Sequence, residues 1–118
     1  MSTQEVLERT RSLQTYIAEG RIHEALDEFY AEDVVMQENE EEPVVGLAAN
    51  REREQVFLDS VERWLGYDVL ALAAADDDAF VESTMSFESK GGDTVRMTQV
   101  SRMRWRDGKI VEERFYHG

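Results

Sequence analysis

The sequence predicts an α+β domain in which helices cover one face of a mostly antiparallel sheet. Residues 80–116 alternate apolar and small polar side chains with a period of two, and breaks that contain glycine divide them into three runs. The first 65 residues instead show apolar side chains at helical spacing. Helices that precede a run of strands segregate to one face of the sheet. With 118 residues and no internal repeat, the chain is expected to be one domain, 1–118.

The first two helices are predicted from their boundary residues. Ser2 and Glu5 have the spacing of a capping box, which predicts that a helix begins at Ser2. This helix should end near residue 18, because Gly20 suits a helix C-terminus. A second helix is expected over residues 21–30, where apolar side chains recur at helical spacing.

The middle of the chain predicts a short strand, an acidic loop and a third helix. Val34-Val35-Met36 is typical of a short strand, and residues 38–43 form the acidic loop. The third helix should follow Gly46 and cover residues 47–64, with a buried stripe of Phe57, Val61 and Trp64. Residues 51–54, with the sequence Arg-Glu-Arg-Glu, should lie on its exposed side.

Four strands are expected after this helix. Gly66 should allow the turn into a strand over residues 67–74, and 76–78, three aspartates, form a solvated turn. A three-strand meander follows over 80–87, 94–106 and 110–116. Its breaks are Lys90-Gly91-Gly92-Asp93 and Arg106-Asp107-Gly108-Lys109.

Composition limits the partners. The chain has 26 acidic and 13 basic residues and a net charge of −13, which argues against nucleic acid because phosphate would be repelled. No apolar run approaches the length of a membrane span, so no membrane association is expected. There is no cysteine and only two distant histidines, so no metal site and no cofactor are predicted, and a cytoplasmic location is expected.

Three short segments, in this order and spacing, resemble the nuclear transport factor two-like superfamily. They are Phe29-Tyr30-Ala31-Glu32-Asp33-Val34-Val35, Gly46 before the third helix, and Trp105-Arg106-Asp107-Gly108-Lys109-Ile110-Val111. The superfamily includes ketosteroid isomerase and the SnoaL-like polyketide cyclases. The resemblance covers essentially the whole chain and implies a cone-shaped, cystatin-like α+β barrel, with three helices packed on a curved sheet.

The resemblance to ketosteroid isomerase also implies catalytic residues. Tyr16 matches the position of its oxyanion-donating tyrosine, and Glu38 matches its carboxylate base. Ser101 stands where that enzyme has a carboxylic acid that an apolar site keeps protonated. A serine is a weaker acid, so steroid isomerisation is not expected. From the residues alone, Glu38 also fits a solvated loop, and Tyr16 fits a core tyrosine.

If Ser101 faces the interior, the period of two places further side chains on the same wall. Pairing Ser83 with Ser101 would set Glu82 opposite Arg102 and Glu88 opposite Arg96. The inner face is then apolar with isolated polar groups, as in a small-molecule pocket; the alternative is a filled core. The expected ligand-binding residues on these two strands are Met85, Phe87, Gln99, Met103 and Trp105.

The last strand has two alternative facings. A two-residue turn would direct Ile110, Glu112, Arg114 and Tyr116 inward. A three-residue turn with a bulge would instead direct inward Val111, Glu113, Phe115 and His117. The resemblance favours the second set, which makes Glu113, Phe115 and His117 candidate ligand-binding residues. A buried glutamate near a histidine could transfer protons, although His117 could also be frayed and exposed.

These observations support two functional hypotheses. In the first, the cone binds a small hydrophobic, carbonyl-bearing molecule, and any reaction is cofactor-free proton abstraction by Glu38 with Tyr16 and Ser101 stabilising an enolate. In the second, the protein is a non-catalytic binding or association module. Either form is expected to be a homodimer through the outer sheet face, with Thr84, Ser86, Thr98 and Val100 at its centre.

Overall fold

The structure, a computed structural model, describes residues 1–118 and contains three helices and six strands. The helices are α1 (Thr3–Ala18), α2 (Ile22–Phe29) and α3 (Leu47–Asp59). The strands are β1 (Tyr30–Glu38), β2 (Val44–Val45), β3 (Val61–Ala75), β4 (Asp78–Ser89), β5 (Thr94–Arg106) and β6 (Lys109–His117).

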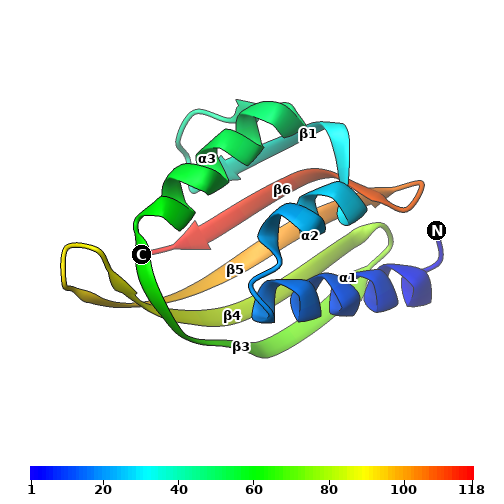
Figure 1. Cartoon of the computed structure of the whole chain (residues 1–118). Helices are drawn as coiled ribbons and strands as arrows, with labels where there is room; N and C mark the ends of the chain where they lie inside the picture. The colour runs from blue at the N-terminus through cyan, green and yellow to red at the C-terminus, as the bar shows by residue number, and fades with distance from the viewer.

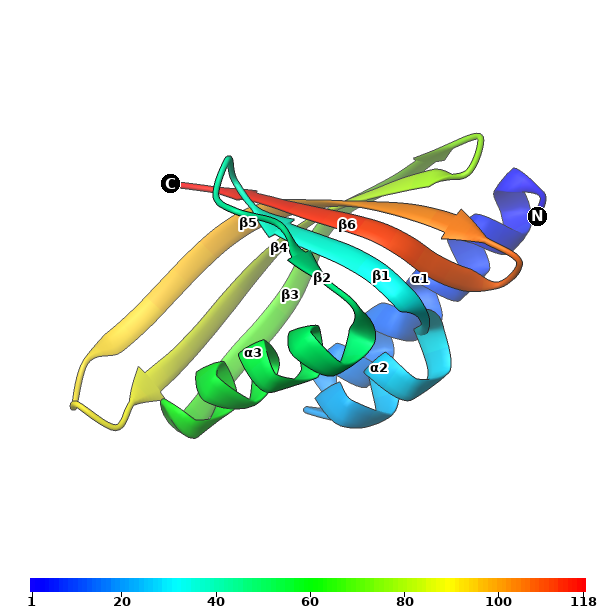
Figure 2. The ribbon, with the colours of Figure 1, turned by 90° about the horizontal axis from the view of Figure 1, so that it is seen from above.

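The strands form a single sheet in the order β2-β1-β6-β5-β4-β3. Only β1 and β6 run parallel, and all other neighbours are antiparallel. All three helices lie against one face of the sheet, which curves around them (Figure 1; Figure 2). The predicted fold class is confirmed, with one refinement: the edge strands β2 and β3 do not pair, so the sheet stays open and no closed barrel forms.

The predicted start of the first helix is confirmed by its cap. The Glu5 N–H donates to the Ser2 hydroxyl at 3.1 Å, and the Ser2 N–H donates to the Glu5 carboxylate at 3.0 Å. These reciprocal bonds satisfy two backbone donors that an uncapped helix leaves free. Val6 and Leu13 on this helix are buried in the core, so α1 is anchored along the sheet.

The predicted length of the third helix is wrong. Helix α3 ends at Asp59, and Val61, Trp64 and Gly66 all belong to β3. The Ser60 hydroxyl donates to the Phe57 carbonyl at 2.6 Å and closes the last turn. Beyond it Trp64 pairs with Phe87 across the sheet, because aromatic and β-branched residues gain more from cross-strand packing than from another helical turn.

The predicted register of β4 and β5 is wrong by two residues. Ser83 lies opposite Gln99, whereas Ser101 lies opposite Val81. A shift of two keeps every side chain on its predicted face. The expected charge pairs are therefore absent: Arg102 pairs with Glu112 of β6 at 2.6 Å, and Glu88 pairs with Arg63 of β3 at 2.9 Å. Each of these two charged residues pairs with a strand outside the β4–β5 pair. Opposite charges on β4 and β5 therefore could not predict how these two strands are aligned.

The last hairpin combines the two alternatives left open by the sequence. Asp107 (φ 51°) and Gly108 (φ 82°) form a two-residue turn of the type that suits twisted hairpins. Ile110 therefore points inward opposite Trp105. A bulge then leaves Val111 unpaired, because Arg104 lies opposite Glu112. The bulge reverses the facing, so that Glu113 is buried as well.

The core fills the space between α1, α2 and one end of the sheet. Its largest fully buried side chains are Trp105, Phe29, Leu13, Met36 and Met103. Phe29 meets Trp105 edge-on, with ring centroids 6.3 Å apart. No helix is both long and apolar enough to cross a membrane.

Candidate functional site

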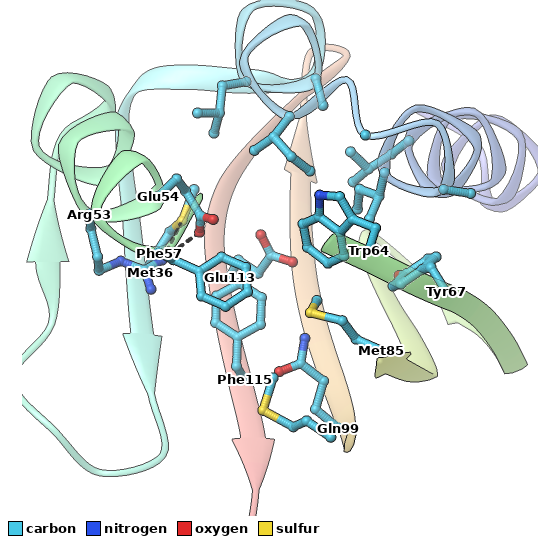
Figure 3. Close-up of a pocket in the computed structure, with 18 of the residues that line it drawn as sticks. Met36, Arg53, Glu54, Phe57, Trp64, Tyr67, Met85, Gln99, Glu113 and Phe115 are labelled. Atoms are coloured by element: carbon cyan, nitrogen blue, oxygen red, sulfur yellow. Dashed lines mark hydrogen bonds and ion pairs between the residues drawn. The ribbon is translucent and has the colours of Figure 1, made fainter. Parts of the chain in front are cut away.

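A cavity of about 440 Å³ lies between the three helices and the inner face of the sheet (Figure 3). Of the 23 residues that line it, 15 are hydrophobic, so the walls are mainly apolar. The volume is in the range of small-molecule pockets. Trp64, with 40% of its surface exposed, lies on the wall where the cavity meets solvent.

Glu113 is the buried carboxyl group of this cavity. Its side chain comes from β6 and is directed toward the cavity (Figure 3), and the residue is only 4% exposed. The Tyr30 hydroxyl donates to one carboxylate oxygen and the Ser101 hydroxyl to the other, each at 2.5 Å. No lysine, arginine or histidine nitrogen lies within 4.0 Å of the carboxylate.

Burial raises the pKa of Glu113 to about 7. The hydrogen bonds from Ser101 and Tyr30 oppose this rise, since they stabilise the ionised carboxylate, while the charge of Glu54 reinforces it. Burial, and then the neighbouring charge of Glu113, raise the pKa of Tyr30 well above its usual value. Tyr30 therefore stays a phenol that donates to Glu113, and the carboxyl group populates both protonation states near neutral pH.

A chain of charged side chains lies at the rim of the cavity. Arg53 donates to Glu38 at 3.0 Å and to Glu54 at 3.3 Å. The second oxygen of Glu38 meets Nε2 of His117 at 2.8 Å, and this contact raises the pKa of His117. Both oxygens of Glu38 thus have a nitrogen partner, and the contact with His117 is an ion pair when the imidazole is protonated. No cluster of three or more metal-ligating side chains is present.

The predicted exposure of Arg53 and Glu54 is wrong. Both side chains are less than 30% exposed and line the cavity (Figure 3). Burial raises the pKa of Glu54, while Arg53 opposes the rise. The sequence contained a signal for this placement, since Glu54 follows the buried Asn50 by four residues and precedes Phe57 by three.

Five of the predicted site residues line the cavity: Glu38, Met85, Gln99, Glu113 and Phe115. Six lie outside its lining: Tyr16, Phe87, Ser101, Met103, Trp105 and His117.

Packing explains why these six side chains lie outside the lining. Tyr16 meets Phe29 edge-on at 5.0 Å, and the Arg21 guanidinium lies 4.0 Å from its ring centre. Phe87 packs against Phe57, at 5.3 Å, and against Trp64, at 5.8 Å. Met103 and Trp105 are covered by the core, and Ser101 and His117 reach the site only through Glu113 and Glu38. The inner face is therefore part filled core and part pocket.

Sequence reasoning missed several lining residues, above all Tyr30, Trp64 and Tyr67. Periodicity places Trp64 in the third helix and Tyr30 at the end of the second, and neither placement directs a side chain into a pocket. Tyr67 donates its hydroxyl to the buried Gln14 of α1, a contact between residues 53 positions apart in the sequence. Only the folded chain brings these groups together.

Residues 10–113 match the family of the SnoaL-like domain. No curated protein sequence is significantly similar to this chain.

Solved structures with the same fold are numerous and distant in sequence. One is a protein from Jannaschia sp. CCS1 named as a SnoaL-like polyketide cyclase, with 15% identity, a TM-score of 0.86, and coverage of 98% of this chain and 86% of that one. Another is named as an isomerase of Bacillus subtilis, with 19% identity, a TM-score of 0.82, and coverage of 100% and 90%. A third is TerC, crystallised with polyporic acid, with 16% identity, a TM-score of 0.80, and coverage of 97% and 92%. These likenesses establish the fold.

Proposed function

This chain belongs to the SnoaL-like domain family, and we propose that it binds a small hydrophobic, carbonyl-bearing ligand in its cavity and transfers a proton on that ligand through Glu113. One observation carries the proposal: a carboxyl group with a pKa of about 7 faces an apolar cavity and is held there by two hydroxyl donors. A general base or acid works best when its pKa lies near the operating pH.

The chemistry requires no cofactor. Ionised Glu113 removes a proton from the carbon beside the ligand carbonyl. The C–H electron pair becomes the enolate double bond, and the carbonyl oxygen takes the negative charge. The proton held on Glu113 then returns to the same or another carbon, which gives exchange or isomerisation. Gln99 lines the same wall, and its amide is a neutral donor suited to the enolate oxygen.

The sequence-derived assignment of Glu38 as the base is the competing hypothesis. Glu38 lines the cavity, but its two oxygens are engaged by Arg53 and His117. A carboxylate that is stabilised by an arginine and a histidine contact must give up part of that stabilisation to take a proton. We therefore assign the base to Glu113. Ser101 acts as a positioning residue for this carboxylate, and Tyr16 has no direct role.

The proposal can be tested with α-tetralone, a bicyclic ketone with an acidic C–H. Exchange of its α-hydrogens for deuterium in D₂O is followed by NMR with and without protein. Wild type should accelerate the exchange; Glu113→Gln should lose about 100-fold or more of that acceleration, while Glu38→Gln loses less than about tenfold. Full exchange by folded Glu113→Gln would overturn the assignment, and no acceleration by wild type would reject enolisation of such ketones.

A second candidate is a non-catalytic module that associates through its outer sheet face. Val100 is 37% exposed there, beside Phe80 and Tyr116 at 40% and 41%. On β4 and β5, the hydroxyls of Thr84 and Thr98 form a hydrogen bond with each other at 3.0 Å. We propose a homodimer through this face, with twice the 13.6 kDa chain mass in solution. Light scattering tests this: Val100→Arg should yield monomer, and a monomeric wild type would reject the dimer.

The named relatives are consistent with a ligand in the cavity. TerC was crystallised with polyporic acid, and other structures of this fold are named as cyclase or isomerase. The cytoplasmic location remains a prediction of the cysteine-free sequence.

A further inference from the structure

The cavity carries an excess of negative charge. Four acidic side chains line it against a single arginine, Arg53; they are Glu19, Glu38, Glu54 and Glu113. The protein as a whole has a net charge of −13, which raises the local concentration of cations near such a cleft.

Outside the lining, Arg21 pairs with Glu19 at 3.0 Å and His117 contacts Glu38 at 2.8 Å. For Glu54 and Glu113, Arg53 is the one basic residue in the lining, and it cannot balance both. Its guanidinium is shared between Glu38 at 3.0 Å and Glu54 at 3.3 Å. Glu113 has no cationic partner at all within 4.0 Å. Its two donors are neutral hydroxyls, which stabilise the negative charge without cancelling it.

Aromatic rings form part of the cavity wall, beside a larger number of aliphatic side chains. Phe57, Trp64, Tyr67 and Phe115 all contribute rings to it (Figure 3). The rings of Phe57 and Trp64 are 6.0 Å apart and inclined at 62°, so they present faces and edges at different angles to the cavity. Aromatic faces attract ammonium groups, and cages of such rings recognise quaternary ammonium ligands.

We propose that the ligand of this cavity is a hydrophobic cation, an apolar skeleton carrying a protonated or quaternary nitrogen that lies between Glu54 and Glu113. The inference rests on the proposed binding of a ligand in the cavity and names its charge class. A carboxylate or phosphate ligand would face Glu54 and Glu113, and the one arginine in the lining is already shared between Glu38 and Glu54. A cation supplies the missing counter-charge and favours the ionised form of Glu113.

The test uses three ligands of similar size and different charge: trimethyl(2-phenylethyl)ammonium, 4-phenylbutan-1-ol and 4-phenylbutanoate. Isothermal titration calorimetry near pH 8 should give the ammonium an affinity about tenfold above that of the alcohol. The carboxylate should bind about tenfold more weakly than the alcohol, or not at all. Because the quaternary nitrogen has no proton to lose, its charge is constant at every pH.

Variants identify the groups that carry the selectivity. Glu54→Gln and Glu113→Gln should each weaken ammonium binding about fivefold or more, and should change alcohol binding less than about twofold. The matched control is Glu62→Gln at an exposed carboxylate outside the cavity, which should change neither. Near pH 7 the ammonium should also displace up to about half a proton from Glu113, and Glu113→Gln should abolish this release.

Each other outcome overturns the inference. The inference is wrong if the carboxylate or the alcohol binds as tightly as the ammonium. It is also wrong if both cavity variants keep the wild-type affinity for the ammonium, or if none of the three ligands binds. None of these outcomes depends on catalysis, since the ammonium probe has no exchangeable C–H. The two proposals can therefore fail separately. Hydrogen exchange on the ketone without a preference for the ammonium rejects only the cationic ligand. A preference for the ammonium without hydrogen exchange rejects only the proton transfer.

Discussion

The hydroxyl of Ser101 donates a 2.5 Å hydrogen bond to the carboxylate of Glu113. The two residues lie on adjacent strands of one hairpin, and Glu113 itself lies opposite Met103. The contact exists because the bulge at Val111 directs Glu113 inward after a two-residue turn has already directed Ile110 inward. Ser101 thus uses its only hydroxyl proton to hold the Glu113 carboxylate and does not line the cavity.

Replacing Ser101 by alanine should raise the pKa of Glu113 further, because one of the bonds that stabilise its ionised form is lost. The variant should lose about 1–2 kcal/mol of stability near pH 8, and less near pH 5 where the carboxyl group is protonated. Carbon NMR titration of the Glu113 carboxyl and urea denaturation measure the two effects. Ser83→Ala, at a buried serine of β4 with no bond to Glu113, is the control. An unchanged titration midpoint would contradict the role of Ser101.

Glu113 should make the protein less stable as the pH rises. Its pKa is about 7 in the folded protein, compared with an ordinary value of 4.5, so the folded state binds the proton more tightly than the unfolded state does. Stability from this group is therefore complete below about pH 4.5 and is lost as the pH rises toward and through 7. The loss amounts to about 3 kcal/mol.

Urea denaturation of wild type and Glu113→Gln between pH 5 and pH 8 measures this loss. Glu113→Gln should gain stability relative to wild type across that range, by up to about 3 kcal/mol. The free energy of unfolding of Glu62→Gln should change with pH as it does in wild type, because the replaced carboxylate is exposed. A constant difference between wild type and Glu113→Gln would show that Glu113 titrates in its ordinary range.

The contact between Glu38 and His117 should be visible in the titration of the histidine. Glu38 raises the pKa of His117 through the bond to Nε2, so the stability it provides is present below the ordinary histidine pKa and disappears as the pH rises through the folded value. The His117 side chain is 21% exposed at a rim open to solvent, so the contribution should stay below about 1 kcal/mol. In Glu38→Gln the His117 ring signals should titrate at lower pH than in wild type, whereas Glu40→Gln, at a neighbouring exposed carboxylate, should leave them in place.

Substitutions of two methionines on the inner face of β5 can show which part of this face lines the cavity and which part belongs to the packed core. Met97 lines the cavity, whereas Met103 is fully buried in the core. Met97→Trp should fill part of the cavity, reduce the affinity for α-tetralone and cost little stability. Met103→Trp should cost about 1–3 kcal/mol or prevent folding, because overpacked cores strain their neighbours. Thermal unfolding and calorimetry check the pair, and equal destabilisation by both would mean that the cavity is closed in solution.

Much of the fold could be predicted because its signals are local. The capping box at Ser2, the period of two in the meander and the turn at Asp107-Gly108 each lie within a few residues, and each was confirmed. The predicted length of the third helix was wrong because residues 57–64 fit both a helical and a strand pattern. Phe57, Val61 and Trp64 suit a helical stripe, yet Val61 and Trp64 pair with β4, because cross-strand packing on residues more than twenty positions away outweighs a further helical turn.

By itself the sequence determined the α+β class, the order of the main elements and the inward face of the first two meander strands, since chain-local propensity and period decide these features. The facing of the last strand depended on the bulge at Val111. Tertiary structure decided the site. The buried carboxylate of Glu113 comes from β6, its hydroxyl donors Tyr30 and Ser101 from β1 and β5, and the rim arginine Arg53 from α3. Only packing brings these groups to one cavity. The elevated pKa of Glu113 depends on that burial, a property of the assembled fold that no single segment possesses.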